Sequence, residues 1–459
     1  MSEKQEQQNT ERSRMLGTME MRKLVPTVSV PIMVSMLVQA LYNIVDGIFV
    51  GQYSPDALTA VNLAMPMQML MIAVSTGMGT GINSLISRRL GEKRPHEARD
   101  AARHGILIEF VGWLLFVIVG LFFARAYIGM TKPSAEVLEM GTQYLQIVCT
   151  LSLGQFLSIC FERMMQATGN TKLSMITQLS GAVTNIVLDP ILIFLCHMGI
   201  AGAAVATVIG QCVAAVLGIY MNIQHNPDVQ LGFKYMKPNW KIISPILTVG
   251  IPSVIMNGIG SVMNFGMNQI LQGFHETATG VFGIYFKLQS LFFMPLFGIN
   301  NATISIIAYN YGARKPKRIV HTLKLATAVA VCIMLVGLTI FQLFPDKLLD
   351  LFNPTEDFMA IGVRALRILC LPFPVAAVCI ALSASFQALG NGIYSTIVSL
   401  CRQMLVLLPV AYLLSLTGDV NAVWWSFPVA EVASALVTAL LFARLYRQKV
   451  KPLFSVVQE

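Results

Sequence analysis

The chain has 459 residues, of which 55% are apolar and only 12% are charged. Soluble domains carry about 25% charged residues, so this composition excludes an ordinary soluble enzyme. Twelve membrane helices need about 240 apolar residues, a number that this chain supplies. Because lipid offers no partner for backbone polar groups, we predict an all-α polytopic membrane protein.

The net charge of +9 indicates loop topology in such a protein rather than a nucleic-acid partner. The first 23 residues are polar and contain no short apolar core with a cleavage site, so we expect no signal peptide. The eight cysteines have no CxxC spacing, and we interpret them as packing residues rather than metal ligands or disulfides. We therefore expect no cofactor and no structural metal.

Apolar runs bounded by charged residues and by Gly, Pro or Asn predict twelve spans. In chain order they lie at approximately 26–50, 58–87, 104–124, 140–162, 173–196, 200–222, 245–271, 279–308, 321–344, 361–385, 393–416 and 422–446. We expect the chain to divide into a polar tail at 1–23, an N-terminal lobe at 24–222, a linker at 223–244, a C-terminal lobe at 245–446 and a second tail at 447–459.

Lys and Arg gather in alternate connections. They are frequent in both tails and in the connections that follow spans 2, 6 and 8, and sparse in most of the others. The connection between spans 9 and 10 is acidic, with Asp346, Asp350, Glu356 and Asp357. Because basic residues favour the cytoplasmic side, we expect both termini to be cytoplasmic and the acidic connection to lie outside.

The two halves match each other at a shift of 221 residues without a gap. Gly77 then pairs with Gly298 and Gly91 with Gly312, and QATGN at 166–170 pairs with QALGN. An even number of spans in each half makes the repeats parallel. Such repeats are found in transporters that bind their substrate between the halves.

Several motifs lie in order along the whole chain. They are YNIVDGIFVG at 42–51, the GEKRP and GARKP turns after spans 2 and 8, and TNIVLDPILIF at 184–194. Together they resemble the multidrug and toxic compound extrusion (MATE) family, in particular its MepA-like branch of bacterial multidrug exporters. The resemblance implies two six-helix lobes around a central cleft. It further implies a monomeric inner-membrane antiporter that exports small organic cations in exchange for H⁺ or Na⁺.

By the same motifs, four residues correspond to the ion-coupling cluster of the family's N-terminal lobe: Asp46, Asn185, Asp189 and Thr207. The sequence departs from the sodium-coupled branch that has acids in the C-terminal lobe, since spans 7 and 10 contain no acid in their apolar cores. This difference favours H⁺ over Na⁺, although Asp, Asn and Thr oxygens also suit a hard cation.

The residues themselves support an ion-coupling role. An ionised carboxylate in the bilayer core costs about 2.5 to 3.5 kcal/mol, so each one needs a reason. Asp46 shares a helical face with Gln39 and Asn43, and Asn185 lies one turn from Asp189. We expect Asn43 to support the ion-coupling cluster as well. The alternative is that both acids only satisfy neighbouring polar groups. However, Asp46 and Asp189 correspond to Met267 and Val410 in the second half. If the acids were needed only to stabilise the fold, we would expect acidic residues at these positions in both halves.

Flexible methionines and further polar residues of the spans are candidates for substrate binding. We name Gln39, Met263, Met267, Gln269, Lys287, Arg402 and Glu431. The alternative for the last three is structural pairing, and we expect a pair between Arg402 and Glu431. We expect Glu109 to face solvent near the cytoplasmic end of span 3. We interpret Glu109, Glu162 and Arg163 as interfacial or locally paired charges rather than substrate-binding residues.

Two other functions remain open. A lipid-linked flippase of the same superfamily would need a strongly cationic cavity, for which Lys287 and Arg402 are the only support. A membrane receptor or scaffold would need a sizeable soluble domain, and the tails here are short. No Walker loop and no Ser, His and Asp arrangement is present, so we do not expect an enzyme.

Overall fold

A computed structural model describes residues 13–229, 238–274, 276–352 and 355–456 of the chain. Helices and no strands occur within these ranges, as predicted. The predicted inter-lobe linker falls partly on residues 230–237, and the N-terminal tail on residues 1–12; both stretches lie outside the described residues.

Helices of the first half follow the predicted spans. They are α2 (Met21–Tyr53), α3 (Pro55–Gly91), α4 (Pro95–Ile118), η1 (Val119–Phe123), α5 (Ala124–Gly129), α6 (Ala135–Thr150), α7 (Leu153–Ala167), α8 (Thr171–Pro190), η2 (Ile191–Leu195), α9 (Ile200–His225) and the short η3 (Pro227–Val229). Two of these segments, η1 and η2, are π-helical turns that extend α4 and α8.

Helices of the second half repeat this order. They are α10 (Trp240–Gln272), α11 (Glu276–Gly312), α12 (Pro316–Leu343), α13 (Pro345–Asp350), α14 (Glu356–Leu369), α15 (Phe373–Ala388), α16 (Gly392–Leu400), η4 (Cys401–Leu407), α17 (Leu408–Ser415), α18 (Val420–Trp424), α19 (Ser426–Leu445), η5 (Tyr446–Val450) and α20 (Lys451–Val456). The last helix therefore continues into the stretch predicted as a tail.

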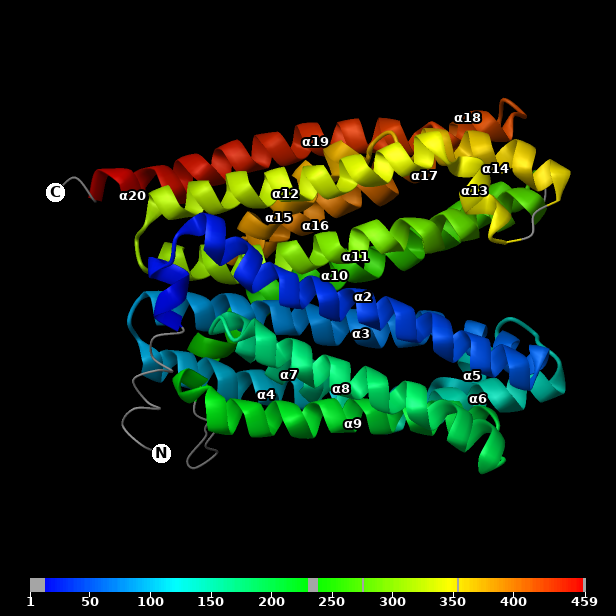
Figure 1. The fold of residues 1–459 in the computed structure, drawn as a ribbon, viewed down its shortest axis with the longest axis horizontal. Coiled ribbons are helices and arrows are strands. Elements are labelled where there is room, and N and C mark those ends of the chain that lie inside the picture. The colour runs from blue at the N-terminus through cyan, green and yellow to red at the C-terminus, as the bar shows by residue number, and fades with distance from the viewer. Residues whose placement is uncertain (1–12, 230–237, 275, 353–354, 457–459) are drawn as a thin grey trace.

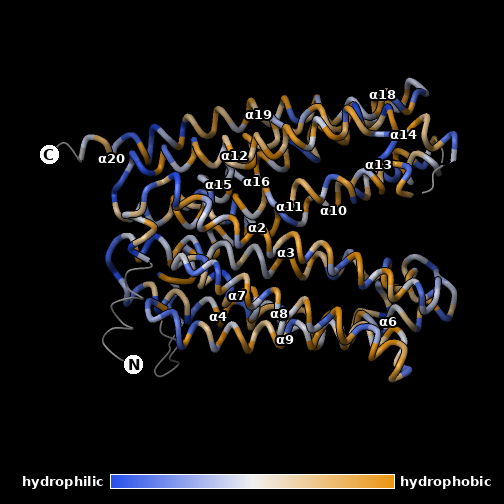
Figure 2. Tube along the Cα trace, in the orientation of Figure 1, coloured by the Kyte–Doolittle hydropathy of each residue, from blue (hydrophilic) through white to orange (hydrophobic). Residues whose placement is uncertain are grey.

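Ten helices are long and apolar enough to cross a membrane, and two bent helix pairs bring the number of spans to twelve in the described part of the chain. The pairs are α6 with α7, bent by 44°, and α14 with α15, bent by 46°. Both breaks fall inside stretches that the sequence predicted as single spans, and they lie at equivalent positions of the repeat. Figure 2 shows apolar residues along the helices and polar residues gathered toward their ends.

The helices form two groups that meet at one end of the molecule. Figure 1 shows α2 to α9 in one group and α10 to α19 in the other, with the starts of α2, α4 and α12 and helix α20 at the same end. The groups lie together at that end and diverge toward the other. Helix α3 packs against α10, and α2 packs against α11, across the two groups.

Glycines make this junction close and symmetric. A Cβ atom at Gly77 would lie 2.5 Å from the backbone nitrogen of Val254, and one at Gly298 would lie 2.8 Å from the Cα of Met33. Met33 and Val254 are themselves 221 residues apart, so the two contacts are images of each other. The repeat predicted from the sequence is therefore a pseudo-two-fold arrangement in space.

A second mirrored contact predicts where the junction tolerates no side chain. A Cβ at Gly91 would lie 2.0 Å from the Tyr309 carbonyl oxygen, and one at Gly312 would lie 2.2 Å from the Arg88 oxygen. We expect Gly91→Ala and Gly312→Ala to destabilise the purified protein by about 1 to 3 kcal/mol in thermal unfolding, because backbone must move.

Gly258→Ala on α10 is the matched control, since nothing lies within 4 Å of its added Cβ. Alanine is the better helix former, so this control should keep or slightly raise the unfolding temperature. Equal stability of all three variants would contradict the tight junction.

Candidate functional site

The four residues of the predicted coupling cluster lie on three helices of the first half. Asp46 lies on α2, Asn185 and Asp189 lie on α8, and Thr207 lies on α9. The Asn185 amide nitrogen donates to Asp189 Oδ1 and to Thr207 Oγ1, both at 3.4 Å. Asp189 is completely buried, and Asn185 is 3% exposed. The structure therefore brings these side chains together.

Close packing of two glycines sets this geometry. A Cβ at Gly181 of α8 would lie 2.8 Å from the Gly210 oxygen of α9, and one at Gly210 would lie 2.7 Å from the Gly181 oxygen. The two helices can approach this closely only because neither residue has a side chain. Asn185 is one turn beyond Gly181, which places its amide within reach of Thr207.

The carboxyl groups of Asp46, on α2, and Asp189, on α8, lie close enough to influence each other electrostatically. Asp46 Oδ1 and Asp189 Oδ2 are buried, and neither receives a hydrogen bond from the described residues. Ionised carboxylates only accept hydrogen bonds, and two adjacent charges repel each other. One proton held between the two groups would remove the repulsion and supply the missing donor.

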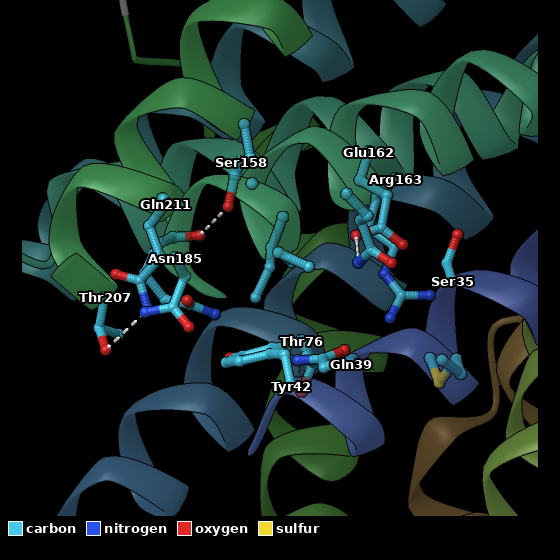
Figure 3. Close-up of a pocket in the computed structure, with 18 residues that line it drawn as sticks. Ser35, Gln39, Tyr42, Thr76, Ser158, Glu162, Arg163, Asn185, Thr207 and Gln211 are labelled. Atoms are coloured by element: carbon cyan, nitrogen blue, oxygen red, sulfur yellow. Dashed lines mark hydrogen bonds between the residues drawn. The ribbon is translucent and has the colours of Figure 1, made fainter. Parts of the chain in front are cut away.

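A small polar pocket adjoins this cluster. Its volume is about 90 Å³, which suits a few water molecules or one ion but not a drug-sized ligand. Figure 3 shows Asn185, Thr207 and Gln211 at one side of the pocket and Glu162 and Arg163 at the other.

A larger cavity of about 430 Å³ lies in the second half. This volume is within the range of small-molecule sites, and aromatic residues and methionines make up much of the wall. The lining residues include Met256, Met263, Tyr285, Phe286, Phe293, Phe427, Arg402 and Glu431. The two halves therefore differ: one contains a polar pocket of ion size, and the other a largely apolar cavity of ligand size.

Comparison with known proteins identifies the family. The model of the MatE family matches residues 31–191 and 252–413, which is one match in each half. The chain belongs to the MATE family of multidrug efflux transporters. This finding confirms the resemblance predicted from the motifs.

Relatives and solved structures agree with this assignment. "Multidrug export protein MepA" of Staphylococcus haemolyticus (strain JCSC1435) is 26% identical over 414 residues, covering 90% of this chain and 91% of that protein. MepA of Staphylococcus aureus (strain MSSA476) is 25% identical and covers 92% and 93%.

A solved structure described as "Outward-facing conformation of a multidrug resistance MATE family transporter of the MOP superfamily" superposes with a TM-score of 0.91 at 25% identity, covering 97% of this chain and 99% of that one. A MATE structure "in the bent conformation" also gives 0.91, at 25% identity, with 98% and 99% covered. The two-lobed MATE fold thus extends over nearly the whole chain.

The expected pair between Arg402 and Glu431 is present in this MATE transporter. Arg402 lies on the π-helical segment η4 and faces Glu431 of α19, with an Nη1 to Oε2 distance of 3.6 Å. Glu431 Oε1 also accepts a hydrogen bond from Ser434 at 3.4 Å. Both charged residues line the larger cavity, so they form an ion pair with each other and also face the cavity.

The other predicted site residues are dispersed. Gln39 lines the small pocket, and Met263 lines the large cavity. Met267 is fully buried in the core of the second half. Three predicted residues are exposed and line neither space: Asn43, Gln269 and Lys287.

The prediction that Glu109 faces solvent is wrong. Glu109 is 1% exposed, and its neighbours include Ser75 of α3 and Arg163 of α7. Helix α4 begins at Pro95 rather than near residue 104, so Glu109 lies about four turns inside the helix. The predicted start of this helix was too late because the first two turns of the helix are charged.

Glu162 and Arg163 belong to a buried polar network rather than to an interface. Glu162 accepts hydrogen bonds from Gln166, at 2.6 Å, and from Gln178 of α8. Arg163 donates to Gln166 Oε1 at 3.1 Å. Sequence reasoning identified the local pairing of these charges but missed Gln166 and Gln178 as partners, although the Gln of the QATGN motif was the available signal.

The ion pair of the large cavity yields a test. We expect Arg402→Ala to lower the thermal stability of the purified protein, because it leaves the buried Glu431 carboxylate without its cation. Arg402→Ala/Glu431→Ala should recover part of the loss, with a coupling energy of about 0.5 to 3 kcal/mol in a double-mutant cycle.

Lys287→Ala is the control for the loss of a cation, because Lys287 is exposed and pairs with no described residue. It should leave stability close to that of the wild type. Strict additivity of the two single changes would show that the 3.6 Å contact contributes nothing.

Proposed function

We propose that this MATE transporter is a secondary active antiporter that exports small organic cations in exchange for H⁺ and works by alternating access. Coupling would take place at Asp46 and Asp189, and drug would bind in the cavity of the second half. The observation that carries this proposal is the proximity of the buried carboxyl group of Asp189 to the half-buried carboxyl group of Asp46, beside a pocket of only about 90 Å³.

The coupling step follows from the charge of the pair. Burial disfavours ionised carboxylates, and proximity disfavours two charges at once, so a proton entering the pair changes the net charge of the lobe. Helix α2 contains Pro26 and Pro31, and α8 passes from Pro190 into a π-helical turn. These are points where a helix can bend when the charge changes. Because α2 packs on α11, a bend in α2 is transmitted to the other lobe.

The same groups offer oxygen ligands for Na⁺. The two carboxyl groups, the unpaired Asn185 Oδ1 and Thr207 Oγ1 are hard ligands of the kind that such ions prefer. We favour H⁺ because spans 7 and 10 of the second half contain no acid in their apolar cores. The proton assignment concerns the coupling ion and is independent of where drug binds.

The substrate class follows from the wall of the large cavity. Aromatic faces attract cations, methionines adapt to different shapes, and Glu431 supplies a carboxylate. A flippase for lipid-linked phosphates would need a strongly cationic cavity. Arg402 is the one cation among the described lining residues, and it is paired, so the flippase is the weaker candidate. No enzymatic or scaffold role is proposed.

We further propose a monomer in the cell (inner) membrane with both termini in the cytoplasm. The basic turns after α3 and α11 lie at the end where the two helix groups meet, together with α20. With these turns on the cytoplasmic side, the groups diverge toward the outside (Figure 1). The molecule would then be closed to the cytoplasm.

The coupling proposal predicts the effect of neutralising either acid. Asp46→Asn and Asp189→Asn should leave the protein in the membrane yet lower ethidium efflux from cells by at least about tenfold, because each variant keeps only one carboxyl group and so loses the charge repulsion and proton sharing between the two acids. Asp56→Asn is the matched control, since Asp56 is exposed at the start of α3. Wild-type efflux from both cluster variants at matched expression would eliminate this mechanism.

In proteoliposomes, replacing the H⁺ gradient by a Na⁺ gradient separates the two ions. Efflux driven by the H⁺ gradient alone is the expected result. Efflux that needs Na⁺ and ignores the H⁺ gradient would contradict proton coupling while leaving the antiport itself intact.

The topology is tested by labelling single cysteines in a cysteine-free background with an impermeant reagent. Replacements of Lys132 and Lys347 should react in intact cells, because they lie in the connections that we assign to the outside. Replacements of Arg94 and Lys315 should react only after the membrane is opened. The opposite pattern would invert the proposed orientation.

A further inference from the structure

A surface groove of about 650 Å³ lies where α2 begins, beside α12 and α20. It has two chemically different parts. One part is basic and the other is apolar: Arg22, Lys317, His321 and Lys324 form the first, and Val320, Leu325, Ala328 and Phe454 form the second. A ligand that fits both parts must have an anionic group joined to an apolar one.

The cations of the groove have no partner of opposite charge. Arg22, Lys317 and Lys324 are exposed, and their side chains form no ion pair or hydrogen bond with the described residues. No acidic residue is among the described residues that line the groove. Like charges held close together repel each other, so a bound anion would be favourable here.

The repeat provides an internal comparison. Lys317, His321 and Lys324 correspond to His96, Asp100 and Arg103 of the first half. There, Arg103 pairs with Asp100 at 3.4 Å, so that copy of the surface neutralises part of its own charge. Placement of basic residues on one side of a membrane explains cations in both copies. It does not explain why only the second copy lacks the acid.

The apolar part continues along the outer face of α12. Lys317, His321, Lys324 and Ala328 follow one another at helical spacing on one face, and the exposed Leu335 lies farther along it. This arrangement places the cations at the end of the helix and an apolar stripe beside them. A phospholipid has the same order of groups, with the phosphate at the membrane surface and the acyl chain below it.

We propose that this groove binds one anionic phospholipid from the leaflet at the end where the helix groups meet. Arg22, Lys317 and Lys324 hold the phosphate and the negative headgroup, and an acyl chain lies along Leu325 and Ala328 toward Leu335. Basic pockets between membrane helices are suited to such headgroups.

Binding at this place joins the two lobes. Arg22 belongs to α2 of the first lobe, whereas α12 and α20 belong to the second, and α2 packs on α12 at this point. A lipid held by both sides stabilises the arrangement in which this end is closed. The site is separate from both cavities described above and does not depend on which drug or ion is transported.

Binding is measured on the purified full chain in a neutral detergent by native mass spectrometry, with phosphatidylglycerol and phosphatidylcholine of identical acyl chains as probes. The wild type should retain one phosphatidylglycerol in preference to phosphatidylcholine. Arg22→Gln/Lys317→Gln/Lys324→Gln should weaken phosphatidylglycerol binding by about tenfold or more, since each basic residue contributes to the attraction.

Lys93→Gln/Arg314→Gln is the matched control, because both cations are exposed and unpaired in turns outside the groove. It should bind phosphatidylglycerol within about twofold of the wild type, which removes less than about 0.4 kcal/mol. Equal binding by the wild type and the triple variant, or equal retention of the two lipids by the wild type, would overturn the proposal.

A second variant and a soluble probe distinguish a lipid from a free anion. Ala328→Trp keeps every cation but fills the apolar part, and it should also weaken phosphatidylglycerol binding. Inorganic phosphate at millimolar concentration should displace little lipid. Displacement by phosphate, together with normal binding by Ala328→Trp, would identify a site for free anions and overturn the lipid assignment.

Discussion

The architecture depends on the close approach of two helix pairs across the junction of the lobes. Helix α3 crosses α10 where Gly77 lies against Val254, and α11 crosses α2 where Gly298 lies against Met33. In lipid, apolar surface gives no hydrophobic gain on helix association, so packing at small residues supplies the attraction. The mirrored contacts place the lobes in one relative position at one end and leave the other end free to separate.

The two lobes have the same backbone arrangement but place their charged residues at different positions. Asp46 and Asp189 of the first lobe have Met267 and Val410 as their counterparts, and Met267 is buried in an aromatic and aliphatic core. Conversely, Arg402 and Glu431 have no charged counterparts at 181 and 210, where glycines pack α8 on α9. One set of backbone positions thus serves close packing in one lobe and a charged pair in the other.

The sequence predicted the features that depend on local pattern. Apolar runs gave twelve spans, and Gly, Pro and Asn placed the repeat in the register that the contacts confirm. The sequence-based predictions failed for features that are determined by contacts between helices. No long polar stretch marks the helix breaks at Leu151 and Leu371 in the sequence. Glu109 was predicted to face solvent because charged residues precede it, but it is buried. Gln178 could not be predicted as a partner of Glu162, since it lies on a different helix.

Four equivalent helix ends show that the repeated fold tolerates backbone strain at some of its turns. The helices that end near Lys93, Gly169, Arg314 and Gly390 all close with the same pair of backbone hydrogen bonds, and all four residues have positive φ, between 53° and 79°. Glycine adopts this conformation freely, whereas Lys and Arg incur about 1 kcal/mol. The two turns that incur this cost are those with a basic residue and a following proline at the proposed cytoplasmic end. At these two turns a basic residue therefore takes the place that glycine would fill without strain, whereas the other two turns, in which Gly169 and Gly390 are half-buried, retain glycine.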